Sequence, residues 1–198
     1  MVAFRYAARS DIGLRRKNNQ DSAYAGINLL VVADGMGGYA GGDVASSLVI
    51  SELAALDNDA PGADALQELE RAIHTAADAI RERVGDEPDL ANMGTTVTAI
   101  LRHGRRLALA HIGDSRAYLL RDGELTQITT DHTFVQRLVD EGRITPDEAA
   151  HHPQRNIVTR VIGDVDAPED VDTSVREAVP GDRWLLCSDG LAGPVSAP

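Results

Sequence analysis

The chain is poor in cysteine, lysine and aromatic residues. Its 198 residues include one cysteine, one tryptophan and two phenylalanines, and the only lysine is Lys17. Cys187 lies inside an apolar run typical of a strand, so we expect a buried free thiol, which excludes disulfides and fits a reducing compartment. No apolar run approaches the roughly 20 residues of a membrane span, and the N-terminus lacks the apolar segment of a signal peptide. These absences predict a cytoplasmic protein with no membrane segment in this chain.

Positive charge is also scarce. The formal net charge is −12, from 31 acidic and 19 basic residues, which argues against nucleic acid or an anionic membrane as the main partner. Nearly all basic residues are arginine, a bias that indicates the base composition of a GC-rich bacterial genome. The basic cluster at residues 15–17 stands out against this background, and by itself it fits a solvated loop. The length and the apolar fraction of 43% predict a single domain, residues 1–198.

Apolar periodicity divides the chain into helices and strands. Spacings of three and four residues predict helices over 41–56 and 66–84, and two shorter ones over 133–141 and 146–151. Hairpin-connected strands dominate the remainder and the helices come in adjacent pairs, so we expect largely antiparallel sheets. The expected strands are 4–9, 22–26, 29–33, 94–101, 105–112, 117–121, 124–128, 173–177 and 183–188.

Three apolar runs end in an aspartate, at Asp34, Asp114 and Asp189. A carboxylate at the end of a buried strand costs free energy unless a positive group meets it. If the strands are neighbours in one sheet, their ends share an edge, and a divalent cation would relieve the repulsion between the carboxylates. Taken singly, each Asp-Gly also fits a turn, and Asp122-Gly123 between two short strands is predicted to be only a hairpin turn.

The glycine-rich segment 35–40 raises the alternative of a dinucleotide site, because it matches G-x-G-x-x-[GA]. That site is excluded because Asp34 would face the pyrophosphate and no strand ending in an acid follows about 20 residues later. The chain has no Gly-Lys-Ser/Thr sequence, which excludes a P-loop. The histidines are scattered along the chain and predict no zinc site.

Five motifs follow one another in an order that resembles a known family. The set strongly resembles the metal-dependent protein phosphatases of the type 2C family, and the bacterial serine/threonine members are the most similar. The segment 131–163 resembles their flap. The resemblance implies an α+β fold with a central β-sandwich of two antiparallel sheets flanked by helices, in four αββα layers. The motifs are Arg16-x-x-x-Gln20-Asp21, Ala33-Asp34-Gly35-Met36-Gly37-Gly38, Met93-Gly94-Thr95-Thr96, Gly113-Asp114-Ser115-Arg116 and Cys187-Ser188-Asp189-Gly190-Leu191.

The resemblance also implies a set of site residues. Asp34 would bridge two Mn²⁺ or Mg²⁺ ions, and Arg16 would bind the substrate phosphate; these two are the predicted catalytic residues. A possible third, weaker ion would lie between Asp114 and Asp189, near the flap. Oxygen ligands suit these hard cations, and a guanidinium suits a phosphate. The full predicted metal-ligand set is Asp21, acting mainly through water, with Asp34, the Gly35 carbonyl, Asp114 and Asp189.

Three departures from the family pattern bear on function. Gln20 stands where many relatives have glutamate. Met36 and Tyr39 stand where relatives often have a histidine as general acid, so that role has no assigned residue, and Tyr39 or a water are the candidates. The family's final Asp-Asn pair, whose aspartate binds the first ion, is absent. The sequence therefore predicts a phosphatase-like domain that is C-terminally truncated, with C-terminal elements of the fold missing.

The predicted function is hydrolysis of phosphoserine and phosphothreonine in proteins by a metal-activated water. The expected partners are phosphoprotein substrates, including bacterial serine/threonine kinases, and the expected state is a monomer. One alternative is a non-catalytic binding or regulatory module that has lost a metal site, which the missing final aspartate favours. Another is a small-molecule metallophosphatase, which would share the chemistry and differ in the shape of its pocket.

Overall fold

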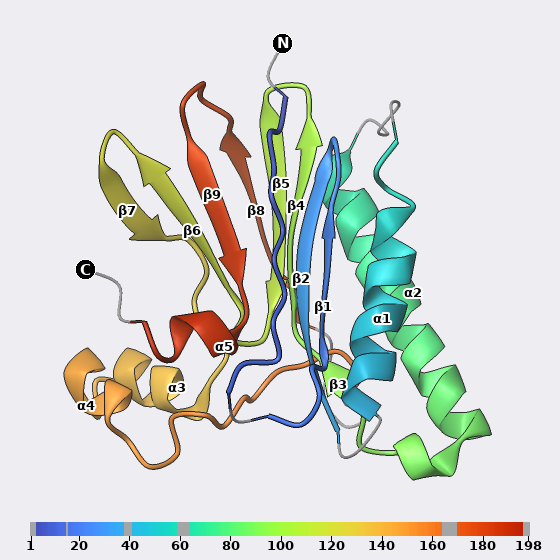
Figure 1. Cartoon of the computed structure of the whole chain (residues 1–198). Helices are drawn as coiled ribbons and strands as arrows, with labels where there is room; N and C mark the ends of the chain where they lie inside the picture. Colours follow the sequence, from blue (N-terminus) through green and yellow to red (C-terminus); the bar gives the residue numbers. More distant parts are fainter. Residues whose placement is uncertain (1–2, 15, 38–40, 59–63, 164–169, 196–198) are drawn as a thin grey trace.

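Two antiparallel sheets form the centre of the molecule in the computed structural model, which describes residues 3–14, 16–37, 41–58, 64–163 and 170–195 (Figure 1). The larger sheet has the order β1-β2-β4-β5-β8, with β3 paired to β2, and the smaller has the order β7-β6-β9. The strands of the larger sheet are β1 (Asp21–Ala25), β2 (Leu29–Met36), β3 (Gly94–Thr95), β4 (Val97–His103), β5 (Arg106–Ile112) and β8 (Asp172–Glu177). Those of the smaller sheet are β6 (Arg116–Arg121), β7 (Glu124–Gln127) and β9 (Arg183–Cys187).

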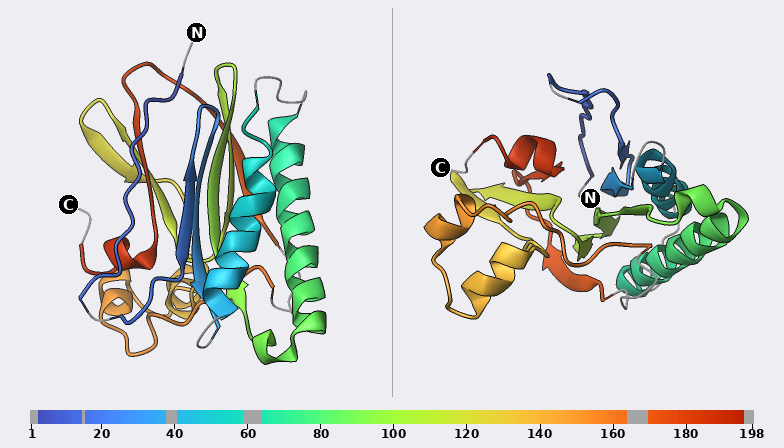
Figure 2. Two further views of the ribbon diagram at one scale, coloured as in Figure 1. Left: turned by 45° about the vertical axis from the view of Figure 1, so that its right-hand side comes forward. Right: turned by 90° about the horizontal axis from the view of Figure 1, so that it is seen from below.

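Two long helices, α1 (Gly41–Ala54) and α2 (Ala65–Asp86), cover the outer face of the larger sheet (Figures 1 and 2). Asp64 caps α2 by accepting hydrogen bonds from two backbone N–H groups of its first turn. In the described part of the chain, no helix is both long and apolar enough to cross a membrane. The remaining helical elements are η1 (Pro88–Leu90), α3 (Phe134–Asp140), α4 (Pro146–Ala150) and α5 (Asp189–Ala192).

Buried side chains form two apolar layers. One lies between the helices and the larger sheet, where alternate residues of β2 such as Leu29 and Val31 meet Val49 of α1 and Ile73 of α2. The other lies between the two sheets. It contains Ile100, Leu107, Leu109 and Ala178, with Phe4, Ile128, Trp184 and Leu186 partly buried against it. The sheets are therefore locked face to face, which fixes the relative positions of their strand ends.

The α+β class and the sandwich of antiparallel sheets flanked by helices confirm the predicted fold. The prediction of a strand over residues 4–9 was wrong. Phe4 packs between the sheets, but the segment makes no ladder with a neighbouring strand and stays extended coil. On the outer face of the smaller sheet, Leu125 and Leu185 are 41% and 44% exposed, so the described residues leave this face largely uncovered.

Candidate metal centre

Asp34 lies inside β2 and not at its end, because the strand continues to Met36. The ladder places Asp34 directly opposite Asp21 of β1. Thr96 and Thr95 hold the Asp34 backbone. The Asp34 N–H donates to Thr96 Oγ1 at 2.9 Å, and the Asp34 carbonyl accepts from the Thr96 N–H and from Thr95 Oγ1, both at 2.9 Å. The backbone that carries this carboxylate is therefore fixed at both its N–H and its carbonyl group.

The glycines after Asp34 allow β2 to meet the start of α1. A Cβ placed on Gly35 would overlap the Gly42 carbonyl oxygen, and a Cβ on Gly42 would lie 2.7 Å from the Gly35 carbonyl carbon. The Gly35 N–H donates to the Gln20 carbonyl at 3.2 Å, and Ser46 of α1 donates to the same carbonyl at 2.7 Å. Gly35 and Gly42 thus allow close packing of backbone against backbone.

Asp114 and Asp189 lie close enough to repel each other, although they follow strands of different sheets. These strands, β5 and β9, end at the same edge of the sandwich (Figure 1). Asp114 follows the end of β5, and the hydroxyl of the next residue, Ser115, lies 2.9 Å from Thr96 Oγ1. Asp189 is the first residue of α5, directly after β9. Its neighbour Ser188 donates to Asp21 Oδ2 at 2.7 Å. The expectation that neighbouring strands of one sheet would supply the three aspartates was therefore wrong, although the carboxylates do converge.

Burial and mutual repulsion both raise the pKa values of the Asp34 and Asp114 carboxylates. Burial first, and then the charges of Asp21, Asp189 and Asp114, raise the pKa of Asp34 to about 8. Burial and the charges of Asp189 and Asp131 raise the pKa of Asp114 to about 6. A cluster of this kind must hold protons or cations to be stable at neutral pH.

The donor set fits hard divalent cations. Every side-chain donor is a carboxylate oxygen, which suits Mg²⁺ and Mn²⁺ and disfavours softer metals. Within residues 3–195, leaving out those not described, no three acidic, histidine or cysteine side chains lie close enough to enclose one ion. The arrangement therefore fits ions that each take one or two shared carboxylates and complete their shells with a backbone carbonyl and water.

Arg16 lies in an exposed segment before β1. Among the described residues it has no hydrogen-bond or ion-pair partner, so its guanidinium is available to an anion. Tyr39, the candidate general acid, lies outside the described residues.

Three supporting residues have functions that the sequence did not reveal. Thr96 binds the backbone of Asp34 and also the hydroxyl of Ser115, the residue after Asp114. Ser188, the residue before Asp189, binds the carboxylate of Asp21. The motif Met93-Gly94-Thr95-Thr96 was the available signal, but nothing local to it indicates that its hydroxyls fix the backbone of a residue about sixty positions earlier.

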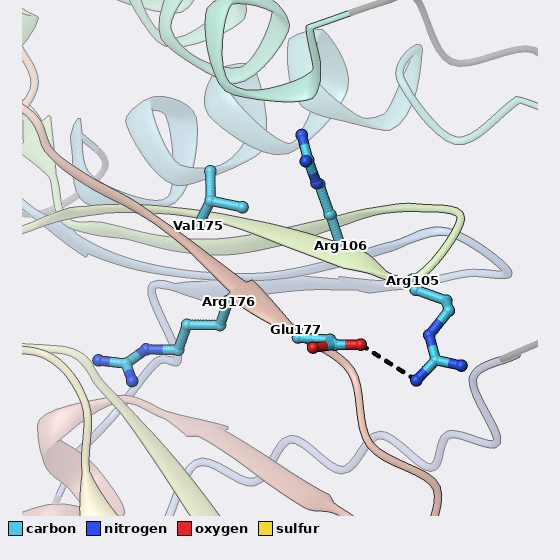
Figure 3. A pocket seen from close by; sticks show the side chains of 5 residues that line it. All are labelled: Arg105, Arg106, Val175, Arg176 and Glu177. Carbon is cyan, nitrogen blue, oxygen red and sulfur yellow. Dashed lines mark hydrogen bonds and ion pairs between the residues drawn. The ribbon is translucent and has the colours of Figure 1, made fainter.

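A cavity of about 330 Å³ lies at the opposite end of β5 and is not a second anion site (Figure 3). Arg105 is paired with Glu177 at 3.0 Å, whereas Arg106 and Arg176 point away from each other on opposite sides of the strands (Figure 3). Three arginines that do not converge cannot bind one phosphate together.

The carboxylate cluster predicts how the stability of the ion-free protein depends on pH. Since the pKa of Asp34 is about 8 when folded and 3.8 in its ordinary state, the folded chain keeps a proton that the unfolded chain has released. Stability should therefore fall as pH rises from 6.5 to 8, by at most about 1.4 kcal/mol per pH unit. Burial lowers the pKa of His111 to about 4, which has the opposite effect but only below pH 6.5.

Thermal unfolding in a chelating buffer measures this slope. Asp34→Asn should remove most of it, and Mn²⁺ should raise the unfolding temperature most at pH 8, where the carboxylates are free to bind. An unfolding temperature that does not change between pH 6.5 and 8 would contradict the raised pKa of Asp34.

The chain is similar to known proteins along nearly its whole length. The family model described as protein phosphatase 2C matches residues 15–197. The serine/threonine protein phosphatase PstP of Mycobacterium tuberculosis is 60% identical over 195 residues, which cover 98% of this chain and 38% of the relative. A putative protein phosphatase 2C-type of Streptococcus pyogenes is 39% identical, covering 95% of this chain and 79% of the relative. This chain thus spans well under half the length of the mycobacterial relatives that it matches.

Solved structures agree with this similarity. A crystal structure of the M. tuberculosis phosphatase PstP/Ppp has a TM-score of 0.95 at 60% identity, covering 98% of this chain and 82% of that one. The catalytic domain of PstP in complex with two manganese ions has a TM-score of 0.90 at 59% identity, covering 98% and 81%.

Proposed function

The chain belongs to the protein phosphatase 2C family, and we propose that it hydrolyses phosphoserine and phosphothreonine in proteins in a metal-dependent reaction. One observation carries the proposal: Asp21, Asp34, Asp114 and Asp189 converge at one edge of the sandwich, although they come from distant parts of the chain. Such a set is costly for a purely structural site, and it provides the oxygen ligands that Mn²⁺ and Mg²⁺ require.

Each residue then has a defined task. Asp34 would be the ligand shared by two ions, the Gly35 carbonyl would complete the second position, and Asp189 would bind the first ion. Asp21 would act through a water, and Asp114 with Asp189 would provide the weaker third position. When bound, the ions lower the pKa of a water molecule and offset the charge of the phosphate.

The protein groups hold the substrate. Arg16 binds the phosphate oxygens through its guanidinium, which can donate two parallel hydrogen bonds. The rigid backbone around Asp34 keeps the carboxylates in place, so little reorganisation is needed during the reaction. A water molecule would attack the phosphorus while the bond from phosphorus to the serine or threonine oxygen breaks. The products would be inorganic phosphate and the free hydroxyl side chain, which takes up a proton, and no covalent phosphoenzyme would form.

We propose phosphoproteins as substrates, bacterial serine/threonine kinases among them, and a monomer acting in the cytoplasm. The 60% identity to a mycobacterial serine/threonine protein phosphatase supports the substrate class. The acidic net charge of −12 supports a protein partner and disfavours nucleic acid.

Phosphate release from a phosphothreonine peptide during a Mn²⁺ titration tests this function. We expect release that depends on Mn²⁺ and stops on chelation. Binding of Mn²⁺ without any release at saturation would favour the non-catalytic module. Release from p-nitrophenyl phosphate but from no phosphopeptide would favour a small-molecule phosphatase.

Arg16→Ala should raise KM for the phosphopeptide by about ten- to a hundredfold, because a hydrogen bond to a charged group contributes roughly 1.5–3 kcal/mol. The unfolding temperature should not change, since Arg16 is exposed. Lys17→Ala is the matched control, because it removes the same charge one residue away and should leave KM near the wild-type value. Equal KM values for both variants would make Arg16 an ordinary loop residue.

A further inference from the structure

His132 binds both backbone groups of Gly113, the residue before Asp114. The Gly113 N–H donates to His132 Nδ1 at 3.0 Å, and the Gly113 carbonyl accepts from the His132 N–H at 2.7 Å. Both residues are buried, and the His132 side chain is only 4% exposed. Without the ring, the Gly113 N–H would have no other hydrogen-bond partner among the described residues.

The contacts of the ring determine which nitrogen carries its proton. A backbone N–H can only donate, so Nδ1 must be the acceptor and Nε2 must carry the hydrogen. Nε2 lies 3.1 Å from Asp172 Oδ2, and Arg160 Nη2 lies 3.1 Å from the other oxygen of that carboxylate. Asp172 therefore fixes the tautomer that Gly113 needs.

Gly113 cannot easily find another conformation. Its φ is +108°, and a Cβ placed there would lie within 2.5 Å of the Thr96 side chain. The turn that carries Asp114 is thus pressed against Thr96 on one side and held by His132 on the other.

His132 also connects this turn to the segment that follows α4. Its carbonyl accepts from the Thr159 N–H at 2.8 Å and from Thr159 Oγ1 at 3.0 Å. The adjacent residue Thr133 forms a β-bridge with Val158. The Asp114 turn and the first residue of β8 therefore meet at the His132 ring, and the segment after α4 is bound to the backbone of His132 and Thr133.

We propose that His132 is a positioning residue, which holds the Gly113–Asp114 turn so that the Asp114 carboxylate faces Asp189 and a weakly bound divalent cation between them. The inference rests on the proposed function, because it takes Asp114 as a cation ligand. His132 does not touch the cation or the substrate; it acts through the backbone of Gly113.

Two nearly isosteric variants separate positioning from packing. His132→Asn places an acceptor near the position of Nδ1 and loses the contact with Asp172, whereas His132→Gln reaches Asp172 and loses the acceptor for Gly113. His111→Asn controls for the loss of a buried histidine, because the His111 ring lies 4.8 Å from that of His132 but bonds Thr98 and Thr130 instead.

Calorimetric titration with Mn²⁺ should show a tenfold or greater rise in the Kd of the weakest site in His132→Gln, and a change below threefold in His132→Asn and His111→Asn. Amide hydrogen exchange at Gly113, followed by NMR, should accelerate only in His132→Gln. Equal losses in the two His132 variants, no change in His132→Gln, or no weak Mn²⁺ site in the wild type would overturn the proposal.

Two further measurements decide the case if His132→Gln does not fold. In the wild type, the ¹⁵N shifts should show the proton on Nε2. They should show the same tautomer in Asp172→Asn, because the amide oxygen can still accept from Nε2, and the Kd of the weakest site should then stay within twofold. A proton on Nδ1 in the wild type would overturn the proposal, and so would a tenfold loss in Asp172→Asn with the proton still on Nε2. These measurements need no phosphate release, so an inactive wild type would count against the proposed function without deciding the role of His132.

Discussion

Asp34→Asn is expected to lower phosphate release from a phosphothreonine peptide by on the order of a thousandfold or more. The side chain is the ligand shared by two ions in the proposed site, and the amide removes one charge and one coordinating oxygen. The Kd for Mn²⁺ should rise in the same variant. In chelating buffer at pH 8, however, its unfolding temperature should increase, because the repulsion among Asp21, Asp114 and Asp189 is reduced.

This combination of lost activity and gained stability cannot come from misfolding. Asp122→Asn is the matched control, because Asp122 also precedes a glycine but lies in the β6–β7 hairpin with φ +53°, a conformation that asparagine tolerates. It should leave both phosphate release and Mn²⁺ affinity unchanged. Near-normal activity in Asp34→Asn would remove the basis for the metal centre.

Gly42→Ala should destabilise the protein by about 1–3 kcal/mol, because the added Cβ would lie 2.7–2.8 Å from backbone atoms of Gly35 and Met36. Neither backbone can move without disturbing the end of β2, so Mn²⁺ affinity should fall together with stability. Chemical denaturation and a Mn²⁺ titration measure the two effects.

Gly85→Ala provides a control of opposite sign. Gly85 also lies in a helix, but a Cβ there has no neighbour within 4 Å. Alanine should stabilise α2 by about 0.5–1 kcal/mol and leave Mn²⁺ affinity unchanged. If both variants were equally stable, the close approach of β2 to α1 would not limit this site.

Local patterns were enough to predict most helices and strands. The helix α2 has regular apolar spacing, and α4 has the capping box formed by Thr145 and Glu148, which depends only on residues three positions apart. Residues 4–9 show where such patterns fail. An alternating segment becomes a strand only when a partner strand lies beside it, and the pattern does not specify that partner.

The carboxylate cluster was predictable in its residues but not in its assembly. An apolar run followed by an aspartate is a local signal, and it selected Asp34, Asp114 and Asp189. That β9 belongs to the other sheet follows from its pairing with β6, for example of Cys187 with Arg116. That Asp34 lies within its strand follows from the pairing of Gly35 and Met36 with β3.

The sequence alone determines which metal-ligating side chains are present and which segments form helices or strands. These are properties of single residues and of their near neighbours. Only the tertiary structure decides which of these groups meet. Ser188 binds Asp21 across 167 positions of sequence, and His132 meets Gly113 through the packing of a loop against a turn. Such contacts depend on how the two sheets are paired and stacked, and this is set by the whole buried core rather than by any short segment.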